Sequence, residues 1–493
     1  LPSHSSRTFS TTNTISTIHE TNNSSSHVSG EQHEHIAHWI CQSSQEEGPF
    51  VNVEEETCET DPLLIHSSRV GPHRHRHLSR LSLTAIIYFA VSGGPEGTES
   101  LISSGGPLYT IIGLCIAAVV WALPTALMTT ELSTAFPENG GFAIWAKTAW
   151  GFTAGGVAGW LQFVSTAVDV ALYPSMFLSY VQAVTSDPFS TYHGNIIKVV
   201  FVTILIMINL AGLDAVGTSS LIMLTLLLLP YIAIIGISSS GAFEWPANPA
   251  NWLVVLPKTD WSTFITVLVW NMGMWEAASV CAGEVANVEQ VYPQAIGTVV
   301  VLVVANYILP IMAFTALNSD WSSYTNGFYI DLVHKLPVVG KGLAICLGMS
   351  QCISAAGLFL NGVAKNSFLV CGMGEQGMLP KIAAWRMPVS ETPGVAVLVT
   401  LVLVCSMMGF GDFRAILGVD MIFYSLSLLL EIASLLRLRA VSPGLPRPYR
   451  IPLDGVGLYA FYTPPVLLAL TVVALSPGDA LVAATVLLGV GLA

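Results

Sequence analysis

Long apolar runs are the feature that most limits what this chain can fold into. Runs such as "IIKVVFVTILIMINLAGL" at 196–213 and "LIMLTLLLLPYIAIIGI" at 221–237 can cross a hydrocarbon layer about 30 Å thick as helices. They lack the strict alternation that strands of a membrane barrel show. Charged residues make up 10% of the chain, whereas soluble proteins have about 25%. The sequence therefore predicts an all-α polytopic membrane protein.

About twelve transmembrane helices are predicted from residue 81 onward. The expected spans are 81–104, 107–133, 152–182, 196–213, 219–240, 262–284, 295–317, 342–371, 393–410, 414–437, 457–475 and 479–493. The last run reaches Ala493 within an apolar stretch, so we expect its helix to be truncated. These spans form a predicted transmembrane domain over residues 79–493.

Residues 1–78 are predicted to be a disordered cytosolic tail. They are rich in Ser, Thr, Asn, His and Glu, and they cannot bury enough apolar surface to offset chain entropy. Glu59, Leu63 and Leu64 have the spacing of an acidic dileucine signal that a sorting adaptor would bind, although a chance match is the alternative. The run "GPHRHRHLSR" suits an anchor on anionic lipid, with a metal site or a pH sensor as alternatives.

The basic residues predict the orientation of the chain, because cytosolic loops carry an excess of Lys and Arg. A cytosolic N-terminus leaves Lys198, Lys258, Lys335, Lys341 and Arg414 outside. It puts a larger set on the inner side: Arg69, Arg74, Arg76, Arg80, Lys147, Lys365, Lys381, Arg386, Arg437, Arg439, Arg447 and Arg450. We therefore expect a multi-pass protein with a cytosolic N-terminus, in the plasma membrane or, alternatively, in an internal membrane.

The first predicted span is interrupted by "AVSGGPEGTES" at 90–100. Glycine destabilises the interior of a helix, and Pro95 has no backbone N–H to donate. A continuous lipid-facing helix is therefore not expected here. Broken backbone at membrane depth is tolerated only where protein or a watery cavity satisfies the freed groups. The sixth span has Asn271, Gly273 and Glu276 in mid-run. Paired interruptions at corresponding positions of two five-helix halves indicate a transporter site.

Five segments carry a resemblance to a known family. They are "VSGGPEGTESLISSGGPLYTIIG", "FPENGGFAIWAKTAWG", "GWLQFVSTAVDVALYPSMFLSYV", "WNMGMWEAASVCAGEVANVEQVYPQAIG" and "LRLRAVSPGLPRPYRIPLDG". From about residue 81 to the end, the chain resembles the amino acid, polyamine and organocation superfamily. Within it, the sequence is most similar to the polyamine transporter branch, close to the L-type amino acid transporters.

The resemblance implies a leucine-transporter-like fold with a 5+5 inverted repeat and two further helices. It also implies that substrate binds at unwound parts of the first and sixth helices, where backbone amides of the first helix hold a substrate carboxylate. This chain departs from the branch at one position. It has Glu96 after the Gly-Gly-Pro, where the branch usually has an apolar or aromatic residue.

The first break supplies five candidate substrate-binding residues. Gly93, Gly94 and Gly97 would offer backbone groups, while Glu96 and Glu99 share one face of the following helix. The alternative for Glu96 is that it only complements the helix dipole. For Glu99, the resemblance places an acid at the matching position, which favours cation binding or helix gating.

Five further candidates come from later spans. Asp169 lies in mid-span, where an unpaired charge costs about 3 kcal/mol, so we expect it to face the cavity, with a structural pair as the alternative. At the second break, Asn271 accompanies Trp275 and Glu276, an aromatic face and a carboxylate that attract an alkylammonium. The alternative there is a structural tryptophan with a solvated glutamate. Tyr424 lines the cavity or packs in the core.

Ion coupling is expected because no nucleotide-binding loop is present. Sodium-coupled relatives need a ring of oxygens between the first and eighth helices, to which Ser350 or Ser354 could contribute. Some proton-coupled relatives carry a lysine in the fifth span, but the run at 221–237 has none. Asp169 and Glu276 are therefore the predicted proton carriers.

Two other carboxylates, Glu131 and Glu284, lie near the inner ends of the second and sixth spans. They stand beside "FPENGG" and "NVEQVYP", which are loop sequences. We expect them to tether inner loops through salt bridges and not to contact substrate.

The predicted function is a secondary active, proton-coupled transporter that takes up polyamines such as putrescine, cadaverine and spermidine. The alternative in the same superfamily is a transporter or exchanger of neutral or cationic amino acids, and a sensor with a transporter fold is a third possibility. No enzyme activity, cofactor or metal is expected, since the spans contain no ligand cluster or nucleophile with a base. The predicted partners are lipid and a small cationic substrate, with no nucleic acid.

Overall fold

The computed structural model describes residues 78–185, 189–240, 248–325, 327–336, 339–407 and 413–492. The predicted tail up to residue 77, the possible sorting signal at Glu59, Leu63 and Leu64, and most of the His/Arg run lie outside these residues. Every regular element within them is helical, and only two isolated β-bridges occur. The all-α class is confirmed.

The described helices follow the predicted spans closely. They are α3 (Arg80–Val91), α4 (Glu99–Ala117), α5 (Leu123–Ala135), α6 (Gly141–Trp150), α7 (Phe152–Thr185), α8 (Thr191–Leu210), α9 (Leu213–Ser240), α10 (Trp261–Met272), α11 (Val288–Leu317), α12 (Phe328–His334), α13 (Gly340–Glu375), α14 (Gly394–Met407), α15 (Phe413–Val441), α16 (Val456–Leu475) and α17 (Gly478–Leu492). Among the described residues, eight helical stretches are long and apolar enough to cross a membrane.

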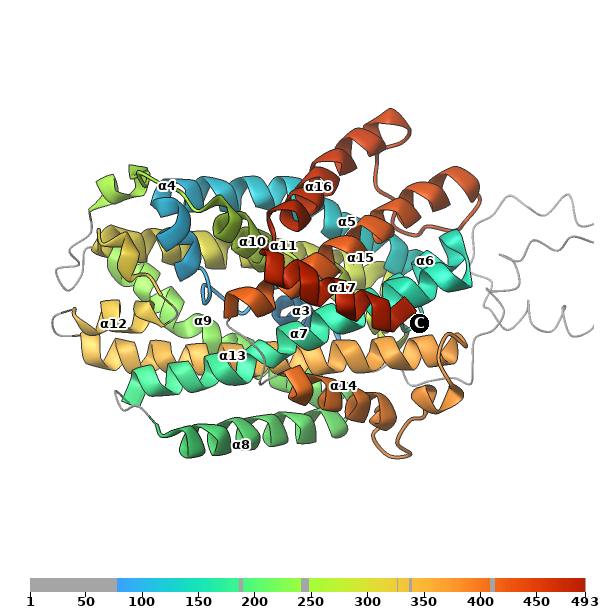
Figure 1. The fold of residues 1–493 in the computed structure, drawn as a ribbon, viewed down its shortest axis with the longest axis horizontal. Coiled ribbons are helices and arrows are strands. Elements are labelled where there is room, and N and C mark those ends of the chain that lie inside the picture. Colours follow the sequence, from blue (N-terminus) through green and yellow to red (C-terminus); the bar gives the residue numbers. More distant parts are fainter. Residues whose placement is uncertain are drawn as a thin grey trace, which may run out of the picture. The chain divides into compact units, whose positions relative to one another are not determined.

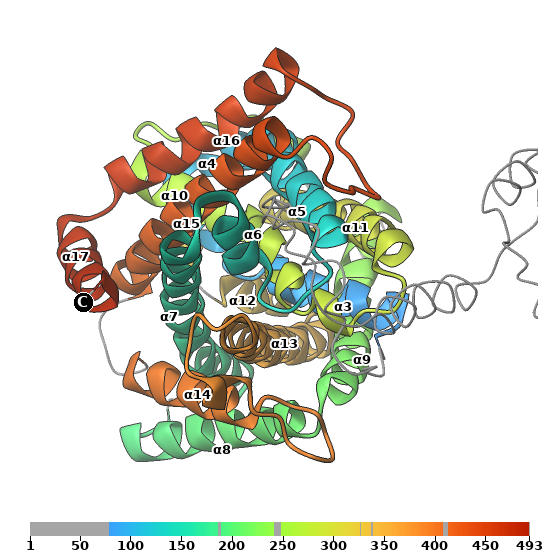
Figure 2. The ribbon, with the colours of Figure 1, turned by 90° about the vertical axis from the view of Figure 1, so that its right-hand side faces the viewer.

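The long helices lie alongside one another (Figure 1). Helices α7 and α13 pack along each other, and α15 packs on α7. Seen along the bundle, α8, α14, α16 and α17 lie at the periphery (Figure 2). They expose apolar side chains, including Ile204, Met207 and Leu467. A bilayer would cover such side chains, and this favours the polytopic arrangement over a soluble one.

The first and sixth spans are broken where the sequence predicts it. Helix α3 begins at an N-cap formed by Ser79 and ends at the extended residue Ser92. Gly94 follows with a φ of 108°, a conformation that L side chains rarely adopt. Helix α10 begins at the N-cap Asp260 and ends at Gly273. A 3₁₀ turn, η5 (Trp275–Val280), then replaces the α-helix.

The two broken helices run antiparallel. The first half of the first span, α3, contacts η5, which is the second half of the sixth span. The second half of the first span forms the start of α4, which continues across a kink at Gly106 into the second span. Helix α4 contacts α10, the first half of the sixth span, and Gly105 of α4 lies against the Phe264 ring of α10. This exchange of halves is the relation expected for two inverted repeats. Both backbone breaks therefore lie next to each other inside the bundle.

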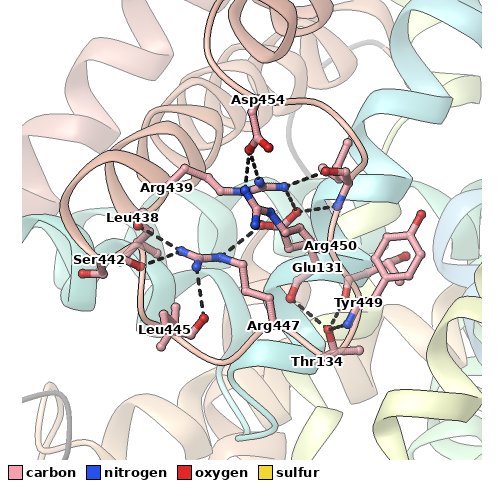
Figure 3. Close-up of polar contacts among 12 residues, drawn as sticks. Glu131, Thr134, Leu438, Arg439, Ser442, Leu445, Arg447, Tyr449, Arg450 and Asp454 are labelled. Carbon is pink, nitrogen blue, oxygen red and sulfur yellow. Dashed lines mark hydrogen bonds and ion pairs between the residues drawn. The ribbon is translucent and has the colours of Figure 1, made fainter.

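Loops at the predicted inner end are held by buried ion pairs. Glu131 at the end of α5 accepts a hydrogen bond of 2.6 Å from Nε of Arg439 at the end of α15, and it lies 3.3 Å from Nε of Arg447 (Figure 3). Arg439 also contacts Asp454 in the following loop. Burial lowers the pKa of the Arg447 guanidinium, and the neighbouring Arg439 adds to this, while Glu131 opposes it.

A second ion pair joins other elements at this end. Nη2 of Arg386 lies 2.8 Å from Oε1 of Glu284, which also accepts a hydrogen bond of 2.6 Å from Asn139. Arg386 follows α13, and Asn139 precedes α6. The sequence prediction that Glu131 and Glu284 tether loops is confirmed by these contacts.

Candidate substrate site

A small cavity lies between the two backbone breaks. Its volume is about 30 Å³, room for roughly two water molecules. Its walls come from the first break, α7, the end of α10, α11 and α13, and include Ser92, Gly93, Glu96, Asp169, Tyr173, Trp270, Asn271, Met274 and Tyr307. A diamine is larger than this space, so side chains must move before one can enter.

Glu96 lies at the cavity wall and is 4% exposed. Its Oε1 accepts a hydrogen bond of 2.6 Å from the phenol of Tyr231 on α9. Its Oε2 is buried and has no hydrogen-bond partner among the described residues. Burying a carboxylate oxygen without a hydrogen-bond partner costs free energy in an apolar interior. This oxygen is therefore suited to bind a cationic ligand or a proton.

Asp169 on α7 lines the same cavity. Its Oδ2 accepts a hydrogen bond of 2.5 Å from Tyr173, one helical turn later, and its Oδ1 accepts one of 3.0 Å from the indole of Trp270. Both oxygens are thus oriented by donors from two helices. Asp169 faces the cavity as predicted, and it also has the structural partners that were the alternative.

The backbone amides of the first break are already engaged. The Gly94 amide donates to Oγ of Ser92 at 3.1 Å, and the Gly97 amide donates to Oε2 of Glu99 at 2.9 Å. Gly97 has a φ of 84°, and a Cβ there would lie 2.8 Å from the Trp270 ring. A substrate carboxylate would have to compete with the chain's own groups for these amides.

Glu99 does not line the cavity. Its Oε1 accepts a hydrogen bond of 3.2 Å from the amide of Gly327, just before α12. The neighbouring Thr98 exchanges a hydrogen bond of 2.8 Å with Tyr329 in α12. Of the two roles predicted for Glu99, these contacts favour gating, because they join the start of α4 to the loop segment that carries α12.

At the second break, Asn271 and Glu276 point to different places. Asn271 lines the cavity and donates to the carbonyl of Val267. Glu276 is not among the residues that line the cavity. Its Oε1 accepts a hydrogen bond of 2.5 Å from Gln162, and its Oε2 accepts one of 3.4 Å from Tyr424. Tyr424 also accepts the amide hydrogen of Met274 at 2.8 Å. The predicted residues therefore form two neighbouring groups.

The structure places two residues differently from the sequence prediction. Trp275 is buried, donates to the carbonyl of Met272, and is absent from the cavity wall, where Trp270 stands instead. Lys365 was counted among the inner-side cations, but it is buried within α13, 3.8 Å from Oε1 of Glu276. Lys365 lies near the end of a long predicted span, where a lysine is usually expected to face the cytosolic loop. In the structure it contacts buried residues inside the bundle instead.

One face of α7 joins these groups. Gln162 donates a hydrogen bond to Glu276, and Ser165 donates one of 2.5 Å to Asp420. Asp169 lines the cavity. Positions 162, 165 and 169 share a helix face. Asp420 was missed in the sequence, although it stands between apolar residues in the span 414–437, the same signal that selected Asp169.

The hydroxyls considered for a sodium site donate to backbone carbonyls. Ser354 donates to the carbonyl of Gly93 at 2.6 Å, and Ser350 donates to that of Leu227 at 2.8 Å. Both serines lie on α13. These contacts fix α13 against the first break and against α9.

Comparison with known proteins agrees with this architecture. Residues 78–490 match the family model described as amino acid permease. The chain belongs to the amino acid permease family.

This permease is 34% identical over 410 residues to polyamine transporter PUT1 of Oryza sativa subsp. japonica, covering 82% of this chain and 75% of that protein. It is 34% identical over 431 residues to a probable polyamine transporter of Arabidopsis thaliana, covering 86% of each. Similarity to L-asparagine permease 1 of Mycobacterium tuberculosis is weaker, at 24% over 340 residues, covering 63% of this chain and 66% of that protein. Its relatives are thus transporters.

Proposed function

We propose that this permease is a secondary active transporter that takes up polyamines such as putrescine, cadaverine and spermidine. The observation that carries the proposal is the pair of carboxylates, Glu96 and Asp169, on one small cavity at the paired backbone breaks. The plant relatives named as polyamine transporters support the same substrate class. A dication gains from each carboxylate that it approaches, because both charges are partly removed from water.

The occupied amides support a cation over an amino acid. A substrate carboxylate would meet Glu96 within a few ångströms, and this repulsion amounts to several kcal/mol at an effective dielectric near 20. It would also have to displace Ser92 from Gly94 and Glu99 from Gly97. An alkylammonium is not repelled by Glu96 and does not compete for these amides.

Aromatic side chains around the cavity suit the carbon chain and charge of such a substrate. Trp270, Tyr173 and Tyr307 all line it. Aromatic faces attract ammonium groups, and they also cover methylene groups. An extended diamine would then place one ammonium near Glu96 and the other towards Asp169 or Glu276.

Proton coupling is the second part of the proposal. Buried carboxylates in a membrane domain are typical of proton relays. Asp169 lies on α7, and Glu276 on η5 accepts a hydrogen bond from Gln162 on the same face of α7. The basic residues that flank the spans support a cytosolic N-terminus. The plasma membrane is the location that we propose for the protein. A sorting adaptor at Glu59, Leu63 and Leu64 remains part of this proposal.

The decisive experiment is uptake of radiolabelled putrescine by a polyamine-auxotrophic cell that expresses the full chain. We expect saturable uptake that unlabelled spermidine inhibits and that neutral amino acids leave unchanged. Reconstituted vesicles would then separate transport from a sensor role, since a sensor binds substrate without carrying it.

Amino acid transport is the second candidate, and the similarity to L-asparagine permease 1 favours it. In the same assay, uptake of a labelled neutral amino acid with no uptake of putrescine would establish this candidate and exclude the first. Exchange of internal for external amino acid would identify an exchanger.

A further inference from the structure

Lys365 on α13 places an ammonium group at the second backbone break. Its Nζ lies 3.8 Å from Oε1 of Glu276 and 3.4 Å from the sulfur of Met274. The side chains of Lys365 and Glu276 are 6% and 0% exposed. A distance of 3.8 Å is longer than a hydrogen bond, and a thioether is a weak acceptor. The ammonium is therefore held mainly by charge and not by short hydrogen bonds.

Lys365 stands between two cavities. Met274, which its ammonium touches, belongs to the wall of the substrate cavity. The lysine itself lines a second, smaller cavity of about 10 Å³, together with Ala90, Cys281 and Phe368. Ala90 lines both cavities. We call the second one the inner cavity, because the Phe368 ring carries Arg386, the partner of Glu284 at the predicted inner end.

The chemistry of this lysine resembles that of the proposed substrate. A lysine side chain is an ammonium on a four-carbon stem, and putrescine carries an ammonium at each end of a four-carbon chain. Glu276 already has two neutral donors, Gln162 and Tyr424. A carboxylate has about four acceptor positions, so Glu276 can still receive a cation, and Lys365 is the cation beside it.

We propose that Lys365 is a tethered occupant of Glu276 that one ammonium of the substrate displaces during transport. The inference rests on the proposed polyamine uptake and deepens it, because it makes Lys365 a determinant of affinity and turnover. Met274 lines the substrate cavity and its sulfur lies 3.4 Å from the Lys365 ammonium, so a change in the conformation of this flexible side chain would give substrate a path towards the lysine and its partner.

The pair of Lys365 and Glu276 would act in both halves of the transport cycle. Without substrate, Lys365 neutralises Glu276, since an unpaired buried charge is strongly destabilising in a membrane. The empty carrier can then return. With substrate bound, the lysine turns towards the inner cavity, and its return to Glu276 promotes release of the substrate.

The test compares two substitutions with opposite expected effects. Lys365→Met removes the competing cation, so the purified protein should bind radiolabelled putrescine roughly tenfold more tightly. Lys365→Arg should bind it several-fold more weakly, because a guanidinium holds a carboxylate through two hydrogen bonds. In proteoliposomes, Lys365→Met should lose net uptake and keep putrescine exchange, which needs no return of the empty carrier. Unchanged or weaker binding by Lys365→Met, or unchanged binding by Lys365→Arg, overturns the proposal.

A double substitution separates this effect from folding. In the Glu276→Gln background, Lys365→Met should raise putrescine affinity by less than it does in the unsubstituted protein, because competition for the carboxylate is absent there and only the repulsion between the lysine and the substrate is relieved. An equal gain in the two backgrounds overturns the proposal, and the Lys365→Arg comparison decides the matter if Lys365→Met does not fold. Absence of putrescine uptake by the unsubstituted protein would refute the proposed function itself, which is a different outcome.

Discussion

The phenol of Tyr231 donates a hydrogen bond of 2.6 Å to Oε1 of Glu96. This contact crosses from α9 to the first backbone break and fixes one carboxylate oxygen, while Oε2 has no partner among the described residues. The glutamate is therefore oriented but incompletely satisfied. That condition suits a residue whose second oxygen receives a ligand.

Replacing Glu96 with Phe should weaken putrescine uptake by roughly tenfold and allow a neutral amino acid to enter, because the repulsion of a substrate carboxylate is removed. The measurement is competition by amino acids in the putrescine uptake assay. Tyr231→Phe is the matched control, since it keeps the charge and removes only the orienting hydrogen bond. A small loss with no new substrate would mean that Glu96 only complements the helix dipole.

Glu276→Gln should abolish putrescine uptake. The amide retains the size of the carboxylate but cannot attract an ammonium group, and Lys365 loses its partner. The control is Glu289→Gln in the first turn of α11, an exposed glutamate that lines neither cavity. Putrescine affinity within about threefold of the unsubstituted protein in Glu276→Gln would refute a two-ended cation site.

The sequence predicts the breaks better than it predicts the site. Glycine, proline and a lone polar residue in an apolar run have local backbone consequences, so the interruptions near Gly94 and Gly273 could be read directly. Which neighbouring side chain faces a cavity depends on the rotation of the unwound segment. Trp270 and Trp275 could not be distinguished for that reason.

Side-chain contacts between helices that are distant in sequence were harder to predict. Lys365 and Glu276 are far apart in sequence, and no local pattern indicates that they meet. Tyr173 is a different case, because it lies four residues after Asp169 on the same helix face, a spacing that predicts contact. Asp420 also had a local signal, an isolated acid in an apolar run.

Proton coupling predicts a direction of pH dependence. Uptake of putrescine should rise as external pH falls, because the proton gradient grows, and a protonophore should abolish it. Asp169→Asn should remove this pH dependence if Asp169 carries the proton, while keeping hydrogen bonds with Tyr173 and Trp270 partly in place. Uptake that follows external sodium at fixed pH, in vesicles with defined ions, would discard a proton as the coupling ion.

The pair of Arg386 and Glu284 should keep the inner cavity closed. Arg386 lies 2.8 Å from Glu284 and over the Phe368 ring, which lines that cavity beside the buried Cys281. Arg386→Gln removes the charge that joins these elements, so Cys281 should react several times faster with a membrane-impermeant thiol reagent.

The reagent would be applied to the cytosolic face of inside-out vesicles, and Cys281→Ser in the same background identifies the signal from this cysteine. Arg450→Gln is the matched control, because its ion pair with Asp454 is mostly exposed and such pairs contribute little. Its labelling rate should equal that of the unsubstituted protein. Equal rates for Arg386→Gln and Arg450→Gln would show that the pair does not close the cavity. Faster labelling in Arg386→Gln that added putrescine reverses would instead link closure at this end to substrate in the neighbouring cavity, since Ala90 lines both.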